Sequence, residues 1–304
     1  MRATLSLLVT ICVQLPAALT IPVKRGDLLK RQSETPDDGQ LGCISMKRNA
    51  GEYFYVSDGS SDVCGMYMLG QPDTVLQIEY TQFTIECEAG GLMALVDGWE
   101  LQSEFFPNIE DTGDSFEARY KTFCGVNSPA EVYVASQNVA LIQFRVPEAG
   151  QGFRVRVSYL HNPQPCNVML MPTAGVVTLK NYGERRNCTA SIIYPENILM
   201  LSVDIGVTSR GATVATESGL SVRCHNEAGA DYVEYLYGNG LDVSYMGRKR
   251  AFCGLRSKAD RRSVTLGCQN SAVRLVSSGL YYNSITFSLS KPTAEEIAAF
   301  SPQC

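Results

Sequence analysis

NVALIQFRVPEAGQGFRVRVSY, residues 138–159, decides the fold of this 304-residue chain. Every second residue of its two halves is apolar, first Ala140, Ile142, Phe144 and Val146 and then Phe153, Val155, Val157 and Tyr159. Strict alternation is typical of β-strands that bury one face. The stretch therefore predicts two strands joined by a Gly-containing turn.

The sequence features around this stretch occur twice in the chain. Phe123-Cys124-Gly125 precedes it, and Phe252-Cys253-Gly254 precedes a second strand pair at residues 272–279 and 285–289. Cysteines 43, 64, 87 and 124 align with 166, 188, 224 and 253, and LMALVDGW (92–99) aligns with DYVEYLYG (231–238). The chain is therefore predicted to be a tandem repeat.

Other stretches agree with an all-β chain. LQIEY (76–80), FTIEC (83–87) and LMLSVDI (199–205) also alternate, and in the last of these Leu199, Leu201, Val203 and Ile205 are predicted to share a face. One short helix is expected in KPTAEEIAAF (291–300), where Thr293 and Glu296 have capping-box spacing. Many short strands separated by turn residues indicate antiparallel β-sandwiches.

The N-terminus has the composition of a secretory signal peptide over residues 1–20. Its apolar run is too short to span a bilayer, and no later stretch is long enough, so we expect a secreted, extracellular protein without a membrane span. Residues 21–42 show no period and are interpreted as a polar arm or removable leader, with dibasic pairs Lys24-Arg25 and Lys30-Arg31 as candidate cleavage sites.

Charge and motifs exclude several classes of function. The formal net charge is -5, which is not that of a nucleic-acid binder. No HExxH or G-x-S-x-G motif occurs, and His161 and His225 have no evident nucleophile, so no enzyme and no cofactor are predicted. Ten cysteines follow the signal peptide, and without a C-x-x-C pair five disulfides are favoured over zinc.

The repeated cysteines and aromatic-Cys-Gly tripeptides resemble the CUB domain, a β-sandwich of about one hundred residues. The predicted fold is all-β, with two tandem CUB-like antiparallel β-sandwich domains stapled by disulfides. The resemblance implies bonds between successive cysteines, namely Cys43–Cys64, Cys87–Cys124, Cys166–Cys188, Cys224–Cys253 and Cys268–Cys304. Many CUB domains bind calcium, but no Asp stands in the two loops that correspond to the expected ligand loop. Asp97 and Asp231 alone do not make a site, so no metal is predicted.

A closer resemblance lies in LVDGWELQSEFFP (95–107), SQNVALIQFRVPEAGQGF (136–153), PCNVM (165–169), RNCTASIIYP (186–195) and VRLVSSG (273–279). These strings are similar to the corticotropin-releasing factor binding protein family. The resemblance implies a secreted, non-catalytic glycoprotein that sequesters corticotropin-releasing-factor-like peptide hormones and limits receptor activation. Asn187, in the chain's single N-x-S/T sequon, is the expected glycan site.

Peptide-contact residues are predicted from two strands that are apolar on both faces. In EYFYVS (52–57) Tyr53 and Tyr55 share a face, and in GMYML (65–69) Met66 and Met68 do so. One face of each strand belongs in the core, so the other meets the second domain or a ligand. Tyr53, Tyr55, Met66 and Met68 are the candidates for contact with an amphipathic helical peptide.

The predicted organisation comprises a signal peptide (1–20), an arm (21–42), a first domain (43–160), a linker (161–165), a second domain (166–290) and a tail with a short helix (291–304). The alternative function is an extracellular CUB-domain adaptor that binds a folded matrix protein or protease. Such an adaptor would use a flat, usually calcium-dependent face. Calcium-independent capture of a short helical peptide would favour the hormone-binding hypothesis over this alternative.

Overall fold

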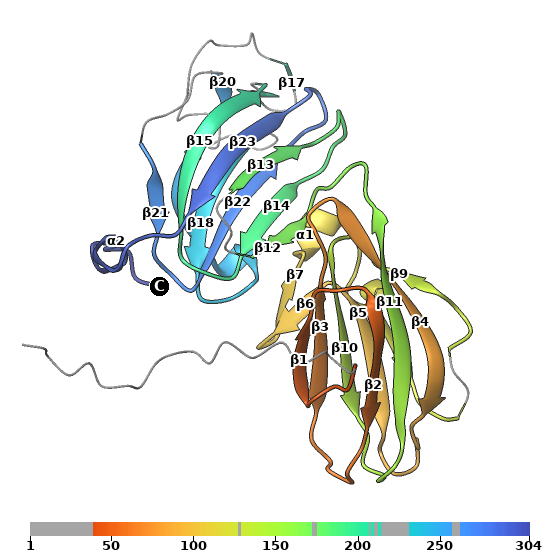
Figure 1. Ribbon diagram of the computed structural model, residues 1–304. Helices are drawn as coiled ribbons and strands as arrows, with labels where there is room; N and C mark the ends of the chain where they lie inside the picture. Colours follow the sequence, from red (N-terminus) through yellow and green to blue (C-terminus); the bar gives the residue numbers. More distant parts are fainter. Residues whose placement is uncertain are drawn as a thin grey trace, which may run out of the picture. The chain divides into compact units, whose positions relative to one another are not determined.

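The computed structural model describes residues 39–126, 129–171, 175–206, 208–209, 212–213, 231–256 and 262–304. The predicted signal peptide, the arm up to residue 38 with both dibasic pairs, His225 and Cys224 lie outside these residues. The described chain is built of short strands with a few single-turn helices (Figure 1). The prediction of an all-β, CUB-like fold class is confirmed.

The first sandwich packs a five-stranded sheet against a four-stranded sheet. Within the five-stranded sheet β1 pairs with β3 in parallel, and all other pairings are antiparallel. The five-stranded sheet has the order β1 (Ile44–Lys47), β3 (Cys64–Leu69), β10 (Val139–Arg145), β5 (Leu92–Asp97) and β8 (Tyr120–Phe123). The four-stranded sheet has the order β2 (Gly51–Val56), β11 (Gly152–His161), β4 (Thr74–Thr84) and β9 (Tyr133–Val134).

The stretch at 138–159 supplies one strand to each of these sheets. Its first half is β10 and its second half is β11, so the turn between them crosses from one sheet to the other. The alternating apolar residues of both halves meet in one core. Phe144 and Phe153 make an edge contact there, with ring centroids 4.9 Å apart. Period two thus places one face of each strand in the space between the sheets.

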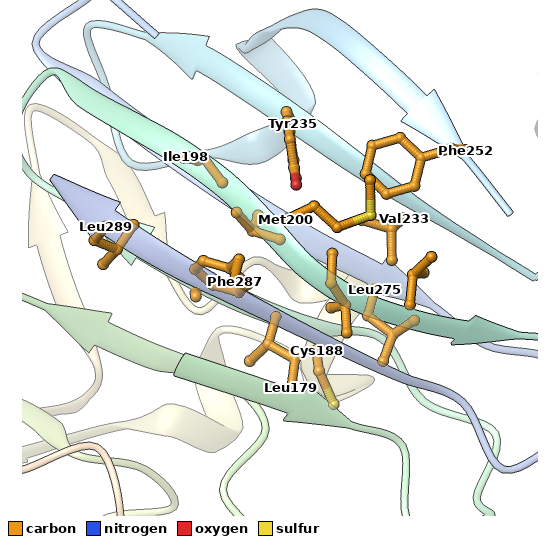
Figure 2. Close-up of a cluster of buried hydrophobic side chains, with 14 of the residues drawn as sticks. Leu179, Cys188, Ile198, Met200, Val233, Tyr235, Phe252, Leu275, Phe287 and Leu289 are labelled. Atoms are coloured by element: carbon orange, nitrogen blue, oxygen red, sulfur yellow. The ribbon is translucent and has the colours of Figure 1, made fainter. Parts of the chain in front are cut away.

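The second sandwich repeats this topology, again with a parallel first pair, β12 with β14. Its strands in order are β12 (Val168–Leu170), β14 (Cys188–Ile192), β22 (Asn270–Val276), β18 (Tyr232–Gly238) and β19 (Gly247–Phe252), then β13 (Gly175–Lys180), β23 (Ser284–Ser290), β15 (Glu196–Ile205) and β20 (Gly254–Arg256), with β21 (Val264–Leu266) also on β15. Figure 2 shows the core between its sheets, where Phe287 of β23 and Met200 of β15 lie near Leu275 and Val233. The repeated Phe-Cys-Gly tripeptides begin at the last residue of the equivalent edge strands β8 and β19.

Smaller elements connect the strands. They are β6 (Trp99–Leu101), β7 (Glu104–Phe106), α1 (Ile109–Thr112), the 3-10 helices η1 (Glu117–Arg119) and η3 (Val243–Tyr245), β16 (Thr208–Ser209), β17 (Ala212–Thr213) and α2 (Ala294–Ala298). The predicted capping box is confirmed, because the Thr293 side chain accepts from the Glu296 backbone and the Glu296 carboxylate accepts from the Thr293 backbone. None of the helices formed by the described residues is long and apolar enough to cross a membrane.

One predicted face is wrong. Ile198, Met200, Val203 and Ile205 are the buried apolar residues of β15, whereas Leu199 and Leu201 are only half-buried. The pairing of β15 with β23 shifts register between Met200 and Ser202. A bulge of this kind inserts one residue and reverses which side chains face the core beyond it.

Four disulfides join described residues, and all four are among the pairs expected from the resemblance. They are Cys43–Cys64, Cys87–Cys124, Cys166–Cys188 and Cys268–Cys304. Cys253 is also disulfide-bonded, while its expected partner Cys224 lies outside the described residues. In the chain-entropy model, loops of 21 to 37 residues contribute about 3–4 kcal/mol each.

Candidate functional site

The four predicted peptide contacts lie in or against the core of the first sandwich. Met66 and Met68 are completely buried, Tyr53 is 4% exposed, and Tyr55 packs against the same cluster. Tyr55 and Phe144 have ring centroids 4.6 Å apart. Tyr53, Met66 and Met68 are enclosed between the two sheets and offer little surface to a partner, so the prediction is corrected for these three. Tyr55 is half-buried and also lines a hollow on the four-stranded sheet, so its contact with a peptide stays a prediction. The apolar faces left for contact are the opposite faces of β2 and β3.

The opposite face of β3 is partly covered by the second sandwich. Residues 38–304 form one compact unit, in which a mixed apolar cluster joins the two copies. The second sandwich contributes Met169 and Leu241 to this cluster, and the first contributes Leu69, Val96, Trp99, Phe106, Val139 and Leu141. Packing between the domains was one of the two interpretations of the second apolar face, and for Leu69 it holds.

Asn138 fixes β12 at this junction. Its amide nitrogen donates to the carbonyl oxygen of Met169 at 2.8 Å, and its amide oxygen accepts from the Met169 backbone N–H at 2.9 Å. Asn138 is completely buried and Met169 is 1% exposed. A buried amide that satisfies both backbone groups of one residue specifies the position of that residue.

A buried charge network crosses the same junction. Asp111 of α1 accepts from Arg274 of β22 at 2.9 Å (Nε) and 2.7 Å (Nη2), and from the Thr189 hydroxyl at 2.6 Å. Glu234 lies 3.3 Å from the same guanidinium. Burial alone would lower the pKa of Arg274, but the charges and hydrogen bonds of Asp111 and then Glu234 raise it overall. The two sandwiches are therefore joined by a satisfied ion pair as well as by apolar contact.

The two copies differ in what covers their first strand. Met46 and Met169 each stand three residues after the first cysteine of their copy, Cys43 and Cys166. Met169 is buried in the junction, whereas Met46 is 46% exposed. In the first copy the equivalent of the junction surface is therefore open.

The open surface consists of Ile44, Met46, Val63 and Tyr67, and we call it the β1 face. Parallel pairing places Ile44 beside Gly65 and Met46 beside Tyr67. Paired residues of neighbouring strands point to the same side of a sheet. Ile44 is 70% exposed and Val63 is 69% exposed. The β1 face is thus an apolar strip at the free edge of the five-stranded sheet.

Tyr67 gives this strip a fixed inner border. Its ring meets that of Trp99 edge-on, with centroids 5.4 Å apart, and its hydroxyl donates to the Glu100 carbonyl oxygen at 3.1 Å. Burial, followed by the charge of Glu100, raises the pKa of Tyr67, so the hydroxyl remains a donor near neutral pH. Gly65 has no side chain, and a Cβ there would lie 3.1 Å from the Tyr67 ring, so the glycine makes room for this ring.

A hollow of about 460 Å³ lies on the four-stranded sheet. Phe54 and Val56 of β2 line it together with Val126 and Arg154. The Arg154 guanidinium lies 4.7 Å from the centroid of the Phe54 ring and covers part of it. The outward face of β2 is therefore more polar than its sequence predicts.

Asp97 and Asp231 act as acceptors for loop residues. Asp97 accepts from the backbone and hydroxyl of Ser136 at 3.0 and 3.1 Å, and Asp231 accepts from the backbone and hydroxyl of Ser278. Burial raises the pKa of both carboxyls despite these hydrogen bonds. Within the described part of the chain, no group of three or more potential metal ligands is found.

Asn187, the expected glycan site, lies at the junction. Its amide nitrogen donates to the Glu110 carbonyl oxygen at 3.2 Å, and Thr189 of the sequon is buried against Asp111. Glycan attachment at Asn187 stays a prediction.

Sequence reasoning missed the β1 face and the Asp111–Arg274 pair. Ile44 and Met46 stand in a four-residue strand, too short for a clear period, and the difference in exposure between Met46 and Met169 is seen only in the structure. The ion pair joins residues 163 positions apart and leaves no local signal.

Comparison with known proteins follows the same division into two halves. Residues 38–161 match the corticotropin-releasing factor binding protein N-terminal domain, and residues 168–298 match the C-terminal domain of that protein. The Homo sapiens corticotropin-releasing factor-binding protein is 33% identical over 261 residues, which are 85% of this chain and 79% of that protein. The Xenopus laevis protein of that name is 33% identical over 247 residues, or 81% and 75% of the two chains.

Among solved structures, the CUB1-EGF-CUB2 domains of rat MASP-1 align with 82% of this chain and 100% of that one, at 11% identity. The TM-score is 0.29, too low to carry a structural argument. The fold and the site define a disulfide-bonded protein of two CUB-like β-sandwiches, in which the first strand is exposed in one copy and buried at the junction in the other. The chain belongs to the corticotropin-releasing factor binding protein family.

Proposed function

We propose that this protein binds corticotropin-releasing-factor-like peptides on its β1 face. In this proposal it is secreted, carries a glycan at Asn187 and keeps the peptide from its receptor, without catalysing a reaction. The relatives that match most of the chain are named for binding corticotropin-releasing factor. The observation that supports the site is the exposure of Met46 where its equivalent Met169 is buried.

The geometry of the β1 face suits a helical peptide. Same-face side chains of one strand are about 6.6 Å apart, since each residue rises about 3.3 Å. Residues four apart on a helix are about 6 Å apart along its axis. Ile44 and Met46 can therefore contact successive turns of an apolar helix stripe, as in other helix-in-groove complexes.

The exposed area is sufficient to matter for affinity. Complete burial of an Ile or Met side chain contributes about 1.5–3 kcal/mol, and ordering a flexible peptide costs about 2–5 kcal/mol. Ile44, Met46 and Val63 together offset that cost. We therefore expect truncation of one of them to weaken binding by about tenfold, the equivalent of about 1.4 kcal/mol.

The test is a fluorescence anisotropy titration of the full chain with a labelled corticotropin-releasing factor peptide. Ile44→Ser and Met46→Ser are compared with Val176→Ser, an exposed valine on edge strand β13 of the second sandwich. The first two variants should bind about tenfold more weakly, and the third should bind as the wild type does.

Two further arms locate any failure. If Val56→Ser weakens binding while Ile44→Ser does not, the site is the hollow at β2 and the β1 face is refuted. Each titration is repeated with a calcium chelator, and we expect no change. Loss of all binding on chelation, or no binding of any such peptide, would instead favour an adaptor that recognises a folded protein.

A further inference from the structure

The second sandwich carries a concentration of positive charge that peptide binding does not use. Residues 248–262 contain seven Lys or Arg and one Asp, in a chain whose net charge is -5. Arg248, Lys249 and Arg250 stand in succession on β19, the edge strand of their sheet. All three are exposed.

The backbone of β19 directs these side chains apart. Arg250 pairs with Tyr235 and Arg248 with Leu236, so Lys249 has no residue opposite it in the β18 pairing. Lys249 instead extends over the Phe300 ring, with its Nζ 4.8 Å from the centroid. A bulge at an edge strand thus presents three cations in different directions along about 7 Å of chain.

Nearby acids neutralise this charge only in part. Glu234 lies 3.5 Å from Arg248, but the same carboxylate also lies 3.3 Å from the buried Arg274. Arg250 forms no ion pair with any residue that the structure describes. Asp111 and Glu110 also pair with Arg274, so Glu234 compensates Arg248 and the positive surface of β19 rests on Lys249 and Arg250.

The equivalent edge of the first sandwich lacks this surface. Lys121 of β8 stands two residues before Phe123, as Arg250 stands two residues before Phe252. Lys121 pairs with Glu131 at 3.3 Å, and β8 contains no other basic residue. Of these two equivalent strands, only β19 therefore carries three cations in succession.

We propose that β19 binds a sulfated polysaccharide through Arg248, Lys249 and Arg250. The hollow beside Arg250 measures only about 40 Å³, whereas all three cations are exposed on an edge strand, a placement that suits an extended partner. Closely spaced cations along one strand match the repeated anionic groups of a linear chain. The aromatic neighbours Tyr235 and Phe252 are buried, and the half-buried Phe300 ring is covered by Lys249, so stacking of nucleic-acid bases is not favoured here.

The test is retention of the full chain on immobilised heparin as a function of NaCl concentration. The site variant is Arg248→Gln/Lys249→Gln/Arg250→Gln. The control variant, Lys121→Gln/Arg154→Gln/Arg156→Gln, changes the net charge equally at exposed or half-buried positions of the first sandwich. For the site variant, the slope of log affinity against log salt should fall by about two to three, in analogy with phosphate contacts. The control variant should keep the wild-type slope.

Further arms separate this proposal from general charge effects. Arg248→Lys/Arg250→Lys should retain heparin binding, and the site variant should keep the wild-type melting temperature and peptide affinity. Equal slopes for the site and control variants would overturn the proposal. It would also be overturned if hyaluronan, which carries no sulfate, bound as tightly as heparin, or if β19 were needed for phosphatidylserine vesicles but not for heparin.

Discussion

Removal of the Asp111 carboxylate should break the buried ion pair that joins the two sandwiches. In Asp111→Ala, Arg274 loses hydrogen bonds of 2.9 and 2.7 Å and Thr189 loses one of 2.6 Å. The Asp111 side chain is completely buried, and that of Arg274 is 10% exposed. Removing one partner of a buried ion pair costs about 3–5 kcal/mol because the other charge remains buried.

Two remaining acids place the expected cost at the lower end of this range. Glu234 and Glu110 lie 3.3 and 3.2 Å from the Arg274 guanidinium and partly compensate its charge. We therefore expect a loss of about 3 kcal/mol. At about 2–4 °C per kcal/mol for a chain of this size, the melting temperature should fall by about 6–12 °C.

Trp99 provides the assay. It is the single tryptophan of the chain, is 4% exposed and belongs to the junction cluster, so its fluorescence reports on opening between the sandwiches. The control is Glu52→Ala, which breaks exposed ion pairs to Arg154 and Arg156 and should cost less than about 1 kcal/mol.

The double variant Asp111→Ala/Arg274→Met makes the test sharper. It removes the buried positive charge of Arg274 together with the Asp111 carboxylate, so it should recover part of the stability that Asp111→Ala loses. The reasoning is refuted if Asp111→Ala lowers the melting temperature no more than Glu52→Ala does. It is also refuted if the double variant loses as much stability as the two single variants, Asp111→Ala and Arg274→Met, lose in sum.

Three other predictions concern the sandwiches and the tail. Trp99→Phe removes the indole N–H that donates to the Met68 carbonyl oxygen at 3.0 Å, so urea denaturation should show a loss of about 1–3 kcal/mol; an unchanged midpoint would contradict this. Thr293→Ala removes the cap of α2 and should cost about 1 kcal/mol locally, seen as faster amide exchange in that helix but not in β23. Burial raises the pKa of Tyr159 to about 12, so the folded state keeps the neutral phenol while the unfolded state ionises from about pH 10. Stability is then lost as the pH rises from about 10 to about 12, and Tyr159→Phe should lose less between pH 9 and pH 11 in urea melts; equal losses would count against the pKa assignment.

Much of the fold could be predicted because alternation is a local property. The residues at 138–159 showed both strands and their buried faces, and the repeated tripeptide showed the second copy. The bulge at Leu201 could not be predicted, because it depends on how β15 pairs with β23 rather than on its own apolar pattern. Register across a sheet is a non-local choice.

The site was harder to predict than the fold. For β3 the two apolar faces were recognised correctly, but sequence alone does not say which face the core takes. Met66 and Met68 pack inward, so Tyr67 and Leu69 face outward. The Asp111–Arg274 pair depends on the junction itself and has no signature in either copy.

The burial of β12 at the junction has a consequence for stoichiometry. Gene duplication ordinarily doubles the number of equivalent surfaces, yet here the second copy uses its first strand to hold the first copy in place. That strand cannot also receive a ligand, so under the proposal that the β1 face binds the peptide, the two copies together offer one such site. A protein of this construction would hold each captured molecule singly and would not cross-link two of them.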